Sequence, residues 1–143
     1  MKKALIIAAL AAPVCQSAVA DPMAVHQTAQ ALFAQLPDVE ARTDLYEACG
    51  FGTNSNPNIG YCASNNTIFV SDDFATRPQA SYEMAHVLGH AIQVRHGIAD
   101  VALLALRNRR SEEDALRGMV TRPVDCVPGV LLASAGLAPA TFH

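Results

Sequence analysis

The sequence contains only two lysines, Lys2 and Lys3, and both lie at its start. With the apolar run at 4–14 and the small-x-small pattern at 18–20, they predict a secretory signal peptide over residues 1–20. The mature chain then carries eight arginines against 13 acidic residues, a net charge of −5. Because nucleic-acid binding needs clustered positive charge to displace counterions from phosphates, this composition excludes a nucleic-acid partner.

Long apolar runs are missing as well. No segment after the signal reaches the roughly 18 apolar residues of a membrane span, so we expect no stable membrane insertion once the signal is removed. The remaining residues, 21–143, suffice for one hydrophobic core, which predicts a single secreted or periplasmic domain. A glycine-rich phosphate loop and a G-x-S-x-G element are also lacking, so no local signal points to a nucleotide or to a serine nucleophile.

Three cysteines remain in the mature chain: Cys49, Cys62 and Cys126. An oxidising compartment favours a disulfide. Residues 50–61 are rich in glycine, asparagine and other turn formers, so Cys49 and Cys62 are the favoured pair. Cys126 is then the odd cysteine, either buried and reduced or available to a site.

Apolar spacing and helix-capping signals indicate a mainly α (α+β) domain with a minor β-hairpin or strand element. The strand is expected at 67–71. Helices are expected at 22–36, 80–95 and 98–106, and a further helix opens at 111–114 with Ser111 as its N-cap.

The predicted helix at 80–95 carries polar side chains on one face. His86 and His90 are four residues apart, about 40° in direction, so both imidazoles can reach one metal ion. Gln93 lies about 20° to one side of His86 and Glu83 about 60° to the other. The rest of the helix is largely apolar, which favours a functional face.

His86, Gly89, His90 and Gln93 match the H-E-x-G-H-x-x-Q helix of the neutral zinc metallopeptidase family, which the chain resembles over about residues 49–137. The likeness extends to three further segments: Cys49-Gly50, Gly60-Tyr61-Cys62 with the strand after it, and Asp125-Cys126-Val127-Pro128-Gly129. The resemblance implies a zincin-like small domain with a His-x-x-x-His helix, a zinc cofactor and a polypeptide substrate or partner. It also implies that Gln93 and Asp125 orient the histidines.

Several departures from that family's pattern affect chemistry. Val87 stands where the family has the glutamate that takes a proton from zinc-bound water. Thr121 stands at the third ligand, and a neutral hydroxyl is a poor zinc ligand. Pro123 and Pro128 are expected to interrupt a stretch that the family keeps helical. The sequence therefore predicts an exported metallopeptidase-like protein that cleaves no peptide (a pseudopeptidase) and retains metal or polypeptide binding.

Two alternatives stay open. In the first, Glu83 is a relocated carboxylate that joins His86 and His90 at zinc, with Asp125 or Cys126 as a fourth ligand, and the protein is an active zinc-dependent peptidase. A carboxylate bound as a ligand is no longer a free base, which counts against this reading. In the second, the protein is a metal-free structural or interaction protein.

Overall fold

The structure is a computed structural model that describes residues 21–52 and 55–137, without the side chains of Val120 and Asp125. The predicted signal peptide at 1–20 lies outside the described residues. The predicted mainly helical α+β class is confirmed. The helices are α1 (Pro22–Leu32), α2 (Leu45–Ala48), α3 (Ala80–Arg95), α4 (Ile98–Asn108) and α5 (Glu113–Ser134), with two 3-10 turns, η1 (Phe74–Thr76) and η2 (Arg110–Glu112).

The sheet has three short strands, in the order β1-β3-β2. The central strand β3 (Thr67–Val70) pairs in parallel with β1 (Asp38–Ala41) and antiparallel with β2 (Ile59–Cys62). All four residues of β3 are buried. β2 and β3 form the expected hairpin, and β3 falls within the predicted strand.

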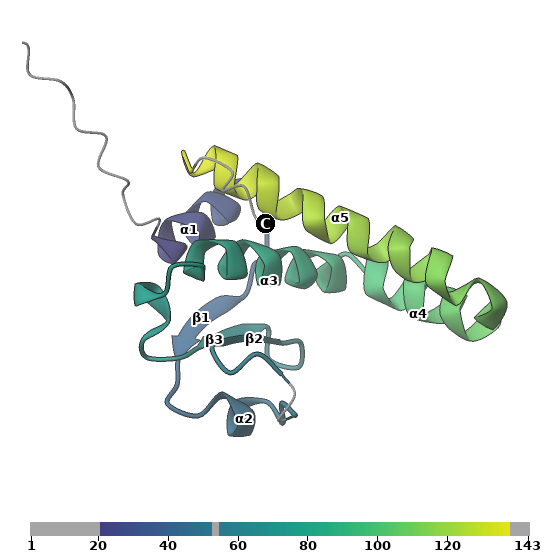
Figure 1. The fold of residues 1–143 in the computed structure, drawn as a ribbon, viewed down its shortest axis with the longest axis horizontal. Helices are drawn as coiled ribbons and strands as arrows, with labels where there is room; N and C mark the ends of the chain where they lie inside the picture. Colours follow the sequence, from purple (N-terminus) through teal and green to yellow (C-terminus); the bar gives the residue numbers. More distant parts are fainter. Residues whose placement is uncertain (1–20, 53–54, 138–143) are drawn as a thin grey trace, which may run out of the picture.

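The core lies between the sheet and the helices. Helix α3 covers one face of the sheet, and α1 and α5 pack on the side of α3 away from it (Figure 1). Ile68 and Val70 of β3 contribute to this main core, whose fully buried members include Met84 and Leu88 of α3 and Leu131 of α5. Helix α3 is therefore held from both sides, which fixes the direction of the face that carries His86 and His90.

A smaller cluster covers the other face of the sheet. Phe69 packs there with Leu45 and Cys62. Cys49 and Cys62 form a disulfide, with their Cα atoms 5.8 Å apart. The predicted pairing is therefore confirmed, and it ties the end of α2 to the end of β2.

Two predictions at helix ends are wrong. Helix α1 stops at Leu32 and not at residue 36, because Phe33 is already extended and Gln35 has a positive φ of 58°. Ser111 is not the N-cap of the last helix. It lies in η2. Helix α5 begins at Glu113, and its N-cap residue is Glu112, whose side chain makes no capping hydrogen bond. Glu113 and Asp114 occupy the first turn of α5, where the helix dipole favours acidic residues.

The expected break at Pro123 and Pro128 is also wrong, because α5 runs through both prolines. Each proline removes one amide donor from the helix. Pro128 is fully buried, and Val124 and Leu131 beside it are buried too. Packing of this half of α5 against α3 outweighs the local cost, since tertiary burial supplies most of the stability of protein helices.

Among the helices that the structure describes, none is both long and apolar enough to cross a membrane.

Candidate functional site

The two histidines of the predicted motif meet on the surface of α3. The Nε2 atoms of His86 and His90 lie 3.2 Å apart, and the rings meet edge to face with centroids 4.8 Å apart. The bounds of α3 are those expected from the sequence, so the four-residue spacing does bring both imidazoles to one place. One of the two Nε2 atoms donates a hydrogen bond to the other.

This separation fits two ligands of one zinc ion. Zinc–nitrogen bonds of about 2.0–2.1 Å in a tetrahedral arrangement place two ligand nitrogens about 3.3 Å apart. The Nε2 atoms of His86 and His90 are therefore spaced as two tetrahedral ligands would be, with little movement needed. The imidazole pair can supply two of the four positions around a zinc ion.

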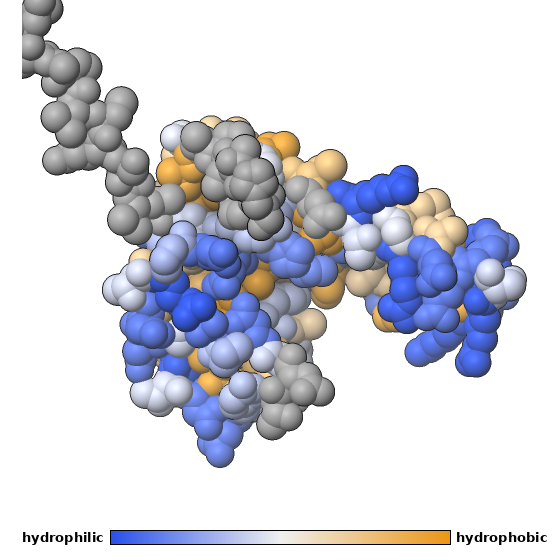
Figure 2. All heavy atoms as spheres, in the orientation of Figure 1, coloured by the Kyte–Doolittle hydropathy of each residue, from blue (hydrophilic) through white to orange (hydrophobic). Residues whose placement is uncertain are grey.

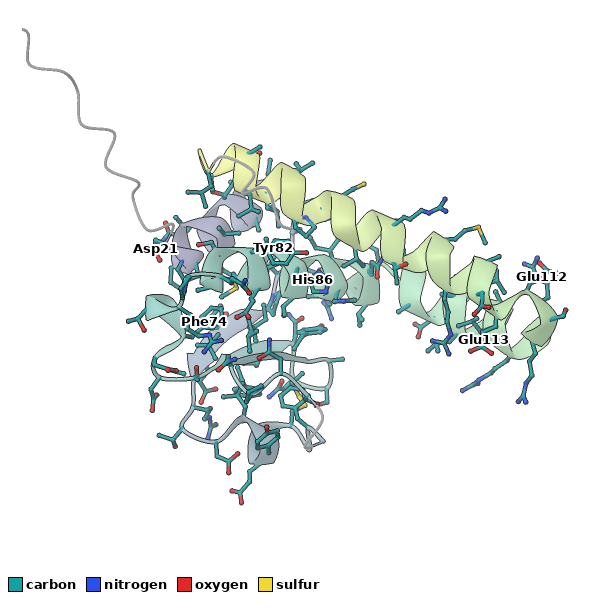
Figure 3. The ribbon with its side chains drawn as sticks, viewed as in Figure 1. Asp21, Phe74, Tyr82, His86, Glu112 and Glu113 are labelled. Carbon is teal, nitrogen blue, oxygen red and sulfur yellow. A yellow bond between two sulfur atoms is a disulfide. The ribbon has the colours of Figure 1, made fainter. Side chains whose placement is uncertain are left out.

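Tyr82, one turn before His86, supports the ring of that histidine. The two rings are stacked, with centroids 6.1 Å apart and planes 26° from parallel. Figure 3 shows Tyr82 and His86 on successive turns of α3. The Nδ1 atom of His86 is buried and has no hydrogen-bond partner among the described residues. Tyr82 was not among the residues predicted for the site, although its spacing of four residues from His86 indicates a contact on the helix.

Glu83 is directed to a different partner. Its Oε2 atom lies 3.9 Å from Nε of Arg77, and the Glu83 side chain is 17% exposed. Both atoms are buried and lack a hydrogen-bond partner within the described part of the chain. No three His, Cys, Asp or Glu side chains of that part lie close enough together to share a metal ion. A zinc ligand role for Glu83 stays a prediction.

A cleft of about 330 Å³ adjoins the histidine pair, between α3, α4 and α5. His90 and the buried Gln93 line it from α3, and Thr121 lines it from α5. The remaining lining is largely apolar: Val94, Ala99, Ala102, Leu103, Leu106 and Val124, with Arg117 at its edge. Residues about 30 positions apart in the sequence line this cleft together. The spacing of apolar residues within each helix did not predict it.

Val87 and Thr121, two residues that differ from the metallopeptidase pattern, both have contacts within the fold. Val87 is half-buried and packs against the main core. The Thr121 hydroxyl donates a hydrogen bond to the Arg117 carbonyl oxygen, at 3.1 Å. Cys126 is exposed and carries a free thiol, so of the two alternatives predicted for it the buried one is wrong. The side chain of Asp125 lies outside the described residues, so its predicted role is untested.

The Tyr61 phenol of β2 has a shifted pKa. Burial raises the pKa of the Tyr61 phenol above its ordinary value of 10.0, and the positive charge of Arg95 offsets part of that rise. The phenol donates a hydrogen bond to Oδ1 of Asn66, at 3.0 Å.

No protein-family model, curated protein or solved structure matches this chain.

Proposed function

We propose that the protein is an exported, metallopeptidase-like protein that cleaves no peptide, binds zinc through His86 and His90, and holds polypeptide segments in the adjoining cleft. The observation that carries the proposal is the 3.2 Å separation of the two Nε2 atoms, which suits two ligands of one zinc ion. The resemblance of the motif to the zinc helix of neutral metallopeptidases supports the same assignment.

The lack of cleavage follows from the residues that stand at the reacting positions. Hydrolysis at zinc needs a base beside the metal-bound water. Val87 provides an isopropyl group in the place of that base, and it packs into the core. The Thr121 hydroxyl is engaged with the helix backbone and replaces an ionised third ligand. With two imidazoles as its protein ligands, the ion would be bound more weakly than in a site with three.

Polypeptide binding is supported by the composition of the cleft. Its walls are mostly apolar and include a few polar groups, among them His90, Gln93 and Thr121, which suits an apolar side chain and its backbone amides. Export is supported by the Cys49–Cys62 disulfide, because such bonds persist in oxidising compartments.

Fluorescein-labelled denatured casein tests both parts of the proposal. The zinc-supplemented parent protein is expected to bind this polypeptide without releasing fragments, and Ala99→Trp, which fills the cleft, is expected to weaken binding. Ala133→Trp, on an exposed part of α5, is the matched control. The double variant Val87→Glu with Thr121→Glu is expected to gain slow cleavage.

Cleavage by the parent protein that disappears in Glu83→Ala would replace this proposal with the relocated-carboxylate peptidase. Equal casein binding by the parent and by Ala99→Trp would remove the cleft from the function. Two results together would favour the metal-free interaction protein. The protein would take up no zinc, and its casein binding would be the same with and without a chelator.

A further inference from the structure

Helix α4 exposes an apolar surface. None of its residues is buried. Val101 is 69% exposed, Leu103 53% and Leu104 57%. Between Ile98 and Leu106 the helix has a single charged residue, Asp100. A helix that is apolar on its outer side as well as on its packed side is typical of one that another element covers.

The outer face of α4 has a defined composition. At 100° per residue, Asp100, Leu103, Leu104 and Arg107 fall within an arc of about 100°. The half-buried residues lie on the other side of the helix and face α3 and α5: Ala99, Ala102, Ala105 and Leu106. We call the four exposed residues of this arc the α4 face. Leu103 stands at its edge and also lines the cleft beside α3 and α5, and Val101 lies about 60° beyond Leu104 on the opposite edge.

The charges at the two ends of the α4 face have opposite signs. Asp100 is in the first turn of the helix and Arg107 is in the last, and both are exposed. Neither forms an ion pair with another residue that the structure describes. The midpoint between them falls between Leu103 and Leu104. The α4 face is therefore complementary to an antiparallel copy of itself.

We propose that a second copy of this chain covers the α4 face. In this dimer the two α4 helices pack antiparallel about a two-fold axis between Leu103 and Leu104. Asp100 of each chain then lies opposite the partner's Arg107, and Leu103 lies opposite the partner's Leu104. A two-fold interface of this kind uses the same surface on both subunits. The antiparallel arrangement also sets opposite ends of the helix dipoles side by side.

The position of α4 leaves room for the second copy. The hairpin of α4 and the first half of α5 extends past the end of α3 (Figure 1). Figure 2 shows a hydrophilic tip on this hairpin, and Figure 3 places Glu112 and Glu113 there. The tip carries both signs of charge, since Arg109 lies 3.5 Å from Glu112, so it lacks the uniform positive charge that an anionic membrane surface attracts.

Sedimentation of the full protein over a concentration series tests the proposal. A single helix of 11 residues offers a small interface, so we expect a dimer that dissociates in the micromolar range. Leu104→Glu is expected to raise the dissociation constant at least tenfold. Leu32→Glu is the matched control, because Leu32 is also about half exposed but lies on α1. Helical circular dichroism checks that each variant is folded.

A charge exchange tests the antiparallel register. Asp100→Arg alone and Arg107→Asp alone place like charges opposite each other, so each variant is expected to be monomeric. Mixing the two variants restores both opposite-charge pairs and is expected to yield a heterodimer. A parent that remains monomeric at near-millimolar concentration would overturn the proposal. So would a dimer that survives Leu104→Glu, or one that each single charge variant still forms as well as the parent.

Discussion

The carbonyl oxygen of Val124 lies 3.4 Å from the position that a Cβ atom on Gly89 would occupy. Gly89 is on α3, one residue before His90, and Val124 is on α5. The absence of a side chain at Gly89 therefore allows the two helices to approach closely beside the histidine pair. Val124 is also the residue whose carbonyl loses its helical donor to Pro128, four positions later.

Replacing Gly89 with leucine is expected to force α3 and α5 apart. Overpacking of this kind costs about 1–3 kcal/mol of the free energy of unfolding. Thermal unfolding measures the change. Gly129→Leu is the control, because Gly129 is a helical glycine of α5 with open space around it. An unaltered melting temperature for Gly89→Leu would show that the contact between α3 and α5 is not tight.

The contact between Glu83 and Arg77 is expected to stabilise the fold. Arg77→Met leaves a largely buried carboxylate without the guanidinium that lies 3.9 Å away. Because this ion pair is long and partly exposed, the expected cost is up to about 1 kcal/mol. Glu83→Gln in the same chain should recover part of this loss, because a neutral amide is easier to bury. A double-mutant cycle in urea measures the coupling between the two residues. Independent, additive losses would show that they do not interact.

The fold is expected to lose stability at alkaline pH through Tyr61. Its pKa is raised in the folded chain, so above about pH 10 the unfolded chain gives up this proton more readily and unfolding becomes easier. Tyr61→Phe should flatten the decline of stability above about pH 10, although it removes the hydrogen bond to Asn66. Equal slopes for the parent and Tyr61→Phe would contradict the assignment.

The sequence predicted α3 within its observed bounds because a long apolar pattern and the stop at Gly97 mark it locally. It did not predict β1, whose four residues are mostly exposed and have no strong strand pattern. This strand forms because the edge of β3 supplies its hydrogen-bond partners, which is a tertiary effect. The continuity of α5 through its prolines has the same kind of cause.

The candidate site likewise has one part that the local sequence predicts and other parts that depend on tertiary packing. The meeting of His86 and His90 follows from helical spacing alone. The cleft beside them needs α4 and α5 to be placed against α3, and no pattern in the sequence encodes that arrangement. The contact of Glu83 with Arg77 likewise depends on the turn before α3, which brings Arg77 back toward the helix.

Zinc content is the most direct test of the account. The full protein, dialysed against buffer with a small excess of free zinc because two imidazole ligands hold the ion weakly, should contain about one zinc ion per chain by elemental analysis. His86→Ala and His90→Ala should each lose the metal while remaining folded. His96→Ala, which alters an exposed histidine just after α3, should retain it. A parent protein free of zinc, or a His86→Ala variant that keeps its zinc, would contradict the central claim.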